Sequence, residues 1–257
     1  MSEFLKICLI VCPLVFLAGF VDSVAGGGGI ISIPAYLMAG IPAHLAAGTN
    51  KVVNGSGTLI ATLKYFQNGK VHLRPAVAAA VGALVGSAIG TQLASMISDA
   101  TLKTIMLIAL PCVAVFLVVK KDFGTNDSSP AVPVSPLRET TLSALIGLGM
   151  GCYDGLVGPG TGTFMIVCFT AFLSMDLLTA SGCSKAANLA SNIAAAAVWI
   201  LHGSVYWKLA APAILCSILG NFLGARYAIR GGSRKIRSMM FVVLGLLFLK
   251  MLYDLAT

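Results

Sequence analysis

The residues Val21-Asp22-Ser23-Val24-Ala25-Gly26-Gly27-Gly28-Gly29 stand between two apolar stretches near the start of the chain. Four consecutive glycines break a helix, because glycine loses more backbone freedom on folding than any other residue. The aspartate that precedes them is equally out of place among apolar neighbours. This stretch therefore predicts a helix break beside a polar site, and the rest of the sequence can be read outward from it.

The composition indicates an integral membrane protein. Hydrophobic residues make up 58% of the 257 residues and charged residues only 10%, whereas soluble domains carry about a quarter charged residues. Several windows of roughly 20 apolar residues could cross a hydrocarbon core as helices, and the sequence lacks the alternation of a membrane barrel. The formal charge of +8 comes from basic residues in short loops and helix ends rather than in one run. Orientation of the protein in a bilayer explains this distribution better than nucleic-acid binding does. We expect an all-α polytopic membrane protein.

Ten apolar segments fall into two groups of five. The first group is Phe4–Ser23, Ile30–Ala39, Leu45–Phe66, Pro75–Ile97 and Leu102–Val119, and the second is Leu142–Leu156, Thr163–Ser174, Leu177–Leu201, Leu209–Ile229 and Ile236–Leu255. The predicted domains are a first transmembrane repeat over 1–120, a polar linker over 121–138 and a second transmembrane repeat over 139–257. The second segment of each group is too short to span a bilayer. We therefore expect about eight long transmembrane helices plus two short broken or re-entrant helices next to glycine-rich breaks.

The two groups repeat each other residue by residue. A shift of 134 maps Gly48, Lys51 and Asn54 onto Gly182, Lys185 and Asn188, and a shift of 132 maps Asp22, Gly26 and Gly28 onto Asp154, Gly158 and Gly160. Internal repeats of this kind are a common basis of transporter folds.

Basic residues indicate that the two repeats have opposite orientations. The loop after the third segment holds Lys64, Lys70 and Arg74, whereas its counterpart is followed only by Lys208. The next loop reverses this imbalance, because five basic residues lie in its second copy, over 226–237. Cytoplasmic loops carry the excess of Lys and Arg, so equivalent loops lie on opposite sides. We expect two inverted repeats, with a cytoplasmic linker and both termini outside.

The glycine breaks and the polar residues after them predict an anion site near the middle of the membrane. Half-helices that start after Gly29 and Gly162 would direct their N-terminal N–H groups toward this site. Lys51 and Lys185 add positive charge at a depth where a lysine costs about 3 kcal/mol. The predicted substrate-binding residues are Gly26, Gly27, Gly28, Gly29, Asn50, Lys51, Asn54, Gly158, Gly160, Thr161, Gly162, Lys185, Asn188 and Asn192.

Two alternatives stay open from the residues alone. The asparagines and serines could merely bridge helices by hydrogen bonds. Asp22 and Asp154 could either neutralise the lysines as ion-pair partners or carry protons that couple transport to a gradient. The sequence has no residue set typical of a catalytic or metal centre and no cofactor fingerprint, so neither enzymatic activity nor a cofactor is expected.

The chain resembles the sulfite exporter TauE/SafE family of membrane transporters. The first signature runs from Gly19 through the glycine run to Pro34 and then Gly48-Thr49-Asn50-Lys51, and the second is Gly155-x-x-Gly158-Pro159-Gly160-Thr161-Gly162. The resemblance implies a bacterial inner-membrane permease for sulfite, organosulfonates or other sulfur-containing anions. The resemblance also implies which residues form the candidate site: Gly26–Gly29, Asn50, Lys51, Gly158, Gly160 and Lys185. Cys183-Ser184-Lys185 replaces Thr49-Asn50-Lys51 in the second copy, which makes the half-sites unequal.

The expected function is secondary transport, in the export direction, of a small sulfur-containing oxyanion by alternating access at a midplane site. An anion channel and a non-transporting membrane scaffold are the alternatives. The expected partners are a small anionic substrate and the lipid bilayer, with no nucleic acid, and a homo-oligomer stays open. The expected localisation is the bacterial cell inner membrane, with multiple spans.

Overall fold

The computed structural model describes residues 3–106, 108 and 135–256, and in these ranges every regular element is a helix. The helices are α1 (Glu3–Ala25), α2 (Gly29–Met38), α3 (Ala43–Gln67), α4 (Leu73–Met96), α6 (Pro136–Leu156), α7 (Thr161–Leu173), α8 (Leu177–Leu201) and α9 (Trp207–Ala256). Residues 99–106 are helical as well. The described part of the chain is therefore all-helical, as the composition predicts.

Three helices in the described ranges are long and apolar enough to cross a membrane: Phe4–Ala25, Leu73–Met96 and Trp207–Val242. The 25-residue helices α3 and α8 are long enough but more polar. Every Ser, Thr, Asn and Lys residue of α8 is buried, including Lys185, whereas in α3 the buried polar residues include Asn50 and Lys51. Both helices therefore keep their lysine at mid-helix inside the protein, which is where a membrane protein tolerates it.

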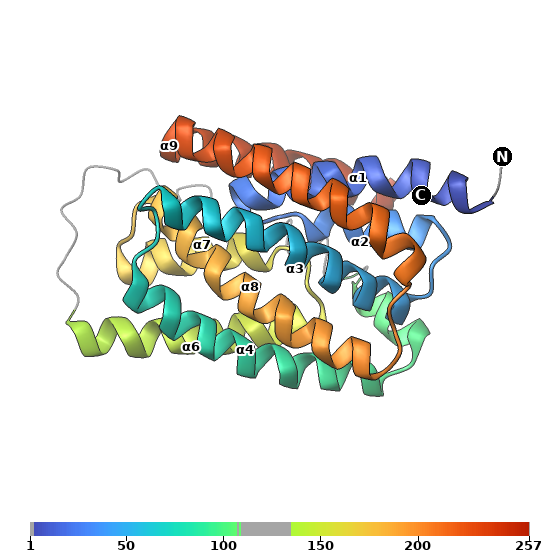
Figure 1. Ribbon diagram of the computed structural model, residues 1–257, viewed down its shortest axis with the longest axis horizontal. Helices are drawn as coiled ribbons and strands as arrows, with labels where there is room; N and C mark the ends of the chain where they lie inside the picture. Colours follow the sequence, from blue (N-terminus) through green and yellow to red (C-terminus); the bar gives the residue numbers. More distant parts are fainter. Residues whose placement is uncertain (1–2, 107, 109–134, 257) are drawn as a thin grey trace.

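The two glycine-rich stretches each turn the chain back on itself. Figure 1 shows α1 coming from the end where the N-terminus lies and α2 returning toward that end, whereas α6 and α7 do the same from the opposite end. The returning helices are short, with 10 residues in α2 and 13 in α7. Both breaks consequently lie within the bundle rather than at its surface ends.

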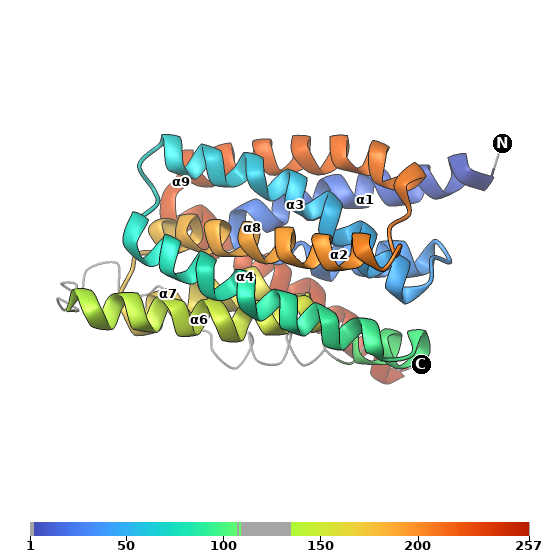
Figure 2. The same cartoon turned by 60° about the horizontal axis from the view of Figure 1, so that its bottom comes forward.

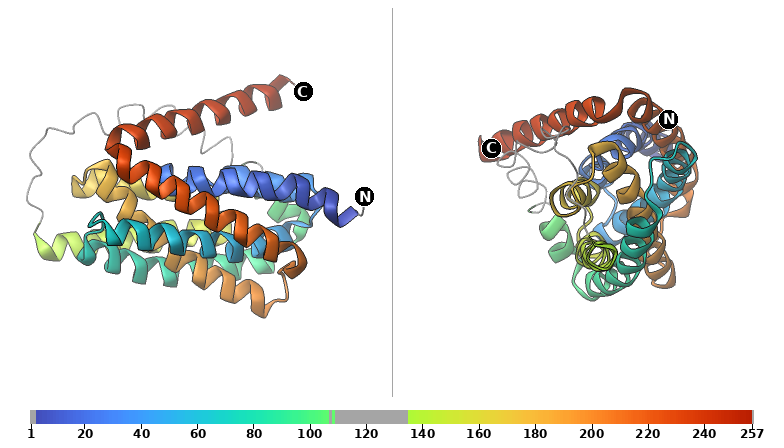
Figure 3. Two further views of the ribbon diagram at one scale, coloured as in Figure 1. Left: turned by 45° about the horizontal axis from the view of Figure 1, so that its top comes forward. Right: turned by 90° about the vertical axis from the view of Figure 1, so that its left-hand side faces the viewer.

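Helix α9 bends sharply at Gly232, whose φ of 62° and ψ of −163° are not helical. Glycine adopts such a conformation without the steric cost that a side chain would add. The bend separates the predicted segments Leu209–Ile229 and Ile236–Leu255, and the chain reverses direction there (Figure 3). One continuous run of helical residues thus supplies two segments.

Helix α6 begins earlier than predicted. The expected segment starts at Leu142 and the expected linker ends at 138, but the helix starts at Pro136. Ser135 caps it, since its hydroxyl oxygen accepts the N–H of Arg138 at 3.4 Å, and proline suits the first helical position. The polar residues of this first turn concealed the start of the helix. The rest of the predicted linker, up to residue 134, lies outside the described residues, as does most of Leu102–Val119.

Equivalent helices of the two halves run in opposite directions (Figure 1). A Cβ atom at Gly48, near the start of α3, would meet Ser204 and Trp199 at the end of α8. A Cβ atom at Gly182, near the start of α8, would meet Lys70 and Tyr65 at the end of α3. The start of α3 therefore packs on the end of α8, and the start of α8 packs on the end of α3. Such reciprocal contacts are typical of a two-fold arrangement.

The same reciprocal packing occurs between two other helix pairs: α4 of the first half packs on α6 of the second, and α9 of the second half packs on α1 of the first. Figure 2 shows α4 and α6 side by side. Small residues allow the backbones to come this close. The glycines Gly82, Gly86 and Gly90 face the carbonyls of Ala144, Leu148 and Cys152, and the glycines Gly220 and Gly224 face those of Phe16 and Phe20. Leu148 and Cys152 are the repeat equivalents of Phe16 and Phe20, so one packing solution is used twice.

Replacing Gly86 by alanine should destabilise the protein, because the new methyl group would overlap the Leu148 carbonyl oxygen. Overpacking of this kind typically costs about 1–3 kcal/mol. Gly149 on α6 is the matched control, since a Cβ there has no atom within 4 Å. Thermal unfolding in detergent should show a lower melting temperature for Gly86→Ala and no loss for Gly149→Ala; equal melting temperatures would contradict the packing described above.

Candidate functional site

The two helix breaks meet inside the bundle and are joined by hydrogen bonds. The N–H of Thr163 donates to the Gly26 carbonyl at 3.0 Å, and its hydroxyl donates to the Ala25 carbonyl at 2.9 Å. A Cβ atom at Gly26 would overlap the backbone of Gly162, and the φ of Gly26 is +79°. The first glycine of the opening stretch is therefore required by the contact between the two halves.

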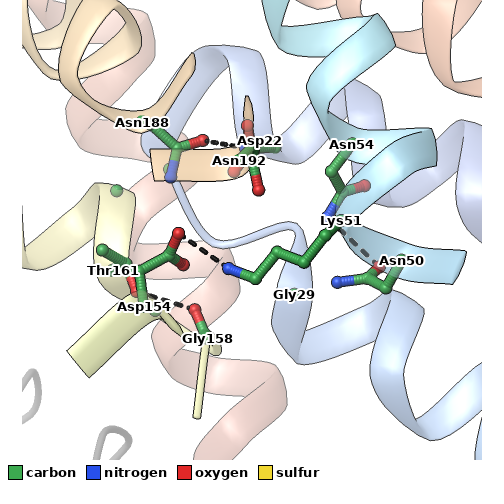
Figure 4. Close-up of a pocket in the computed structure, with 13 residues that line it drawn as sticks. Asp22, Gly29, Asn50, Lys51, Asn54, Asp154, Gly158, Thr161, Asn188 and Asn192 are labelled. Carbon is green, nitrogen blue, oxygen red and sulfur yellow. Dashed lines mark hydrogen bonds and ion pairs between the residues drawn. The ribbon is translucent and has the colours of Figure 1, made fainter. Parts of the chain in front are cut away.

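A small cavity of about 20 Å³ lies where the breaks meet (Figure 4). Its lining combines charged, amide and glycine residues from both halves: Asp22, Gly26, Gly29, Asn50, Lys51, Asn54, Asp154, Gly158, Gly160, Thr161, Gly162, Asn188 and Asn192. A space of this size holds roughly one water molecule. The site is thus small and polar.

Lys51 and Asp154 form an ion pair across the cavity. The Lys51 Nζ lies 2.7 Å from the Asp154 Oδ2, and the two side chains are 7% and 4% exposed. The hydroxyl of Ser191, on α8, also donates to Asp154. Gly158 stands close to the lysine, since a Cβ there would lie 3.7 Å from Nζ. Lys51 comes from the first half and Asp154 from the second, so the pair bridges the halves.

Lys185 and Asp22 form the reciprocal pair. The Lys185 Nζ donates to the Asp22 Oδ2 at 2.8 Å, and the N–H of Gly28 donates to the other carboxylate oxygen at 3.3 Å. The Lys185 side chain is fully buried and does not line the cavity, whereas Asp22 does. The two pairs are equivalent in the repeat but unequal in their access to the cavity.

Paired asparagines cover another side of the cavity. The Asn54 amide donates to the Asn50 oxygen at 3.2 Å, and the Asn192 amide donates to the Asn188 oxygen at 3.1 Å. Among the described residues, the NH2 groups of Asn50 and Asn188 have no protein acceptor. Both residues line the cavity, so their amides can donate to a group that enters it.

The backbone N–H groups contribute less than the sequence suggests. Helix α2 starts at Gly29 and helix α7 starts at Thr161, close to the predicted positions. The N–H groups of Ile30, Ile31, Thr161 and Thr163, however, already have backbone acceptors. Tight local turns and the contact between the breaks therefore use most of the donors that the helix starts would offer.

The structure brings most of the predicted site residues together. Every residue that lines the cavity is in the predicted set of binding residues plus Asp22 and Asp154. Three members of the predicted set stay outside the lining: Gly27, Gly28 and Lys185. Gly28 has a packing role instead, because a Cβ there would lie 2.6 Å from the Ala18 carbonyl oxygen and the Asp22 Cβ.

Three hydroxyl groups position the site, and sequence reasoning missed two of them, those of Thr163 and Tyr153. Thr163 joins the breaks, Ser191 donates to Asp154, and the Tyr153 hydroxyl donates to the Pro159 carbonyl at 2.7 Å. Buried hydroxyl groups need a partner, and each of these lies within or beside a motif. That proximity was the available signal.

No group of three or more His, Cys, Asp or Glu residues that could hold a metal occurs in the described ranges.

Comparison with known proteins assigns the sequence to a family. A family profile described as "Sulfite exporter TauE/SafE" matches residues 11–251. The chain is 37% identical to a "Probable membrane transporter protein ORF9" of Sinorhizobium over 93% of its own length and 90% of the relative's. It is 34% identical to a "Probable membrane transporter protein" of Haemophilus influenzae, with coverage of 93% and 92%.

A third relative is the "Probable membrane transporter protein YfcA" of Escherichia coli, 31% identical over 93% of this chain and 87% of the relative. No solved structure gives a significant match. The family match covers both glycine breaks and both lysine helices. The chain is a multi-pass membrane transporter that belongs to the sulfite exporter TauE/SafE family.

Proposed function

We propose that this protein is a secondary transporter that moves a small sulfur-containing oxyanion, such as sulfite or an organosulfonate, out across the bacterial inner membrane. The observation that carries the proposal is the small polar cavity where the two helix breaks meet, with Lys51 in its lining. Substrate sites of many transporters lie between internal repeats and are built from broken helices. The cavity has both of these features.

The donor set supports an oxyanion as the ligand. Lys51 offers a charged donor, and the NH2 groups of Asn50 and Asn188 offer two neutral donors. Charge-assisted hydrogen bonds to an anionic oxygen are stronger than neutral ones. The family description names sulfite, whereas the relatives' names state only membrane transport.

The alternating-access part of the proposal rests on the two-fold exchange of contacts between antiparallel halves. If the helices cross the bilayer, a two-fold axis perpendicular to them lies in the membrane plane and makes the halves inverted repeats. Rocking of one half against the other could then open the cavity to each side in turn. The complete set of eight long helices is part of this proposal.

Transport should depend on Lys51. A neutral side chain removes a charge-assisted hydrogen bond of about 1.5–3 kcal/mol, which corresponds to a loss of roughly tenfold or more in anion affinity. Lys51→Met alone leaves Asp154 buried and unpaired, which is expected to cost about 3–5 kcal/mol of stability. The decisive variant is therefore the double change Lys51→Met with Asp154→Asn. It should stay folded and fail to transport.

Counterflow of labelled sulfite and of a sulfonate in proteoliposomes measures this loss. Lys208→Met is the matched control, because Lys208 is exposed and lies outside the cavity lining. Full transport by the folded double variant would exclude Lys51 from the site. Flux that neither saturates nor supports counterflow would point to an anion channel, and absence of flux and binding for every sulfur oxyanion tested would point to a scaffold.

The orientation in the membrane gives a separate prediction. The end where α3 stops and α4 and α6 begin carries Lys64, Lys70, Arg74 and Arg138, and the bend of α9 adds Arg230, Arg234 and Lys235. This excess should lie in the cytoplasm. In a variant without native cysteines, Asn68→Cys should react with an impermeant thiol reagent only from the cytoplasmic side. The equivalent His202→Cys should react only from outside. Labelling of both from one side would overturn the inverted arrangement.

A further inference from the structure

The charged residues that line the cavity do not form an anion site as they stand. They are Asp22, Lys51 and Asp154, with formal charges of −1, +1 and −1. Lys185 lies behind Asp22 and brings the sum to zero. An anion that entered without any other change would meet two carboxylates and a lysine that is already paired. Something must therefore neutralise a carboxylate before or while the anion binds.

Space leads to the same conclusion. A cavity of about 20 Å³ holds roughly one water molecule, and a sulfur oxyanion has several heavy atoms. The cation that would bind the anion is 2.7 Å from Asp154. Moving Lys51 away from Asp154 would supply both the room and the positive charge. Anion binding at Lys51 therefore competes with the Lys51–Asp154 ion pair.

Separation leaves Asp154 as a buried carboxylate without a counter-charge. Its side chain is 4% exposed, and the groups that face it are Lys51 from α3 and the Ser191 hydroxyl from α8. One hydroxyl does not offset a full charge at low dielectric, and the arriving anion would add repulsion.

We propose that Asp154 is a proton-binding site whose protonation is coupled to occupation of Lys51 by the anion, an inference that rests on the proposed function. The proton binds a carboxylate oxygen of Asp154 when the anion displaces it from Lys51. The same proton leaves when the anion departs and the ion pair re-forms. Anion and proton then travel in the same direction, so outward transport in this cycle is driven by the concentration gradient of the anion and not by an inward proton gradient.

The charge balance of this cycle is simple for a monovalent anion. The empty site holds Lys51 and ionised Asp154, with a sum of zero. The loaded site holds Lys51, the anion and neutral Asp154, again with a sum of zero. Without the proton the loaded site would carry a net charge of −1 in a low-dielectric interior, which is the costly state. The site is therefore neutral both when it is empty and when it holds the anion and the proton.

Asp22 is the natural comparison because it is the repeat equivalent of Asp154. Its partner Lys185 is fully buried and outside the cavity lining, so an anion in the cavity does not reach that lysine directly. The N–H of Gly28 also holds the Asp22 carboxylate. The Asp22–Lys185 pair consequently stays closed, and the coupled proton belongs to Asp154 alone.

Proton uptake on anion binding tests the coupling in the wild-type protein. Methanesulfonate is the probe, since it is fully ionised and contributes no proton of its own near neutral pH. In weakly buffered detergent solution containing a pH dye, binding should remove about one proton from solution per bound anion. The affinity for methanesulfonate should fall by about tenfold per pH unit once Asp154 is ionised in the empty protein.

Variants identify the group that takes up the proton. Asp154→Asn imitates the protonated carboxyl, so it should bind methanesulfonate with no proton uptake and no pH dependence. Glu139→Gln, which changes a carboxylate in the first turn of α6 outside the cavity lining, should keep both. Uptake that persists in Asp154→Asn would overturn the assignment to this residue.

The possible outcomes separate this inference from the proposed function. Wild-type binding of methanesulfonate without proton uptake would overturn the coupling and leave the anion site standing. Failure of methanesulfonate, sulfite and sulfoacetate alike to bind the folded protein would overturn the proposed function and the coupling with it. The wild-type measurement decides between these results even if neither variant folds.

Discussion

Two buried lysine–carboxylate pairs that join opposite halves are the interaction on which the site depends. Lys51 pairs with Asp154, and Lys185 pairs with Asp22. Removing one partner of a buried pair leaves a charge that the interior cannot solvate. Each half carries one lysine and one aspartate of this set but uses the other half's partners in the folded protein. Charge compensation therefore requires the two halves to come together. The ion pairs form where the break between α1 and α2 meets the break between α6 and α7.

The close packing around the pairs makes this meeting possible. Glycines on α4 and α9 let these helices approach the backbones of α6 and α1, whose far ends carry Asp154 and Asp22. Gly26 allows the two breaks to touch, and Thr163 holds them by two hydrogen bonds. Small residues thus fix the helix positions, and the ion pairs occupy the space that those positions define.

Much of this arrangement could be predicted from the repeat. The shifts of 132 and 134 residues identified equivalent glycines, lysines, asparagines and aspartates, and these positions supply eight of the thirteen residues that line the cavity. A repeat gives equivalence but not contact, however, so it could not tell which aspartate pairs with which lysine. Nor could it show that Lys185 is covered while Lys51 faces the cavity. The early start of α6 was hidden for a different reason, because the first turn of that helix is polar and its signal lies in Ser135 and Pro136.

The inequality of the two half-sites has a chemical consequence. An exactly symmetric site would present two lysines to one ligand and would suit a divalent anion. Here Ser184 stands where the first half has Asn50, and only Lys51 is in the lining. Because the lining carries two carboxylates and one ammonium group, the empty cavity is not a positive trap for anions. Its neutrality, once Lys185 is included, favours a closed empty state in a low-dielectric setting. An anion can enter only by competing with a carboxylate for the lysine, so binding at this site is an exchange of one negative group for another. A site built on such an exchange can bind weakly enough to release its ligand on the far side, which a carrier requires and a permanent cation cluster would hinder.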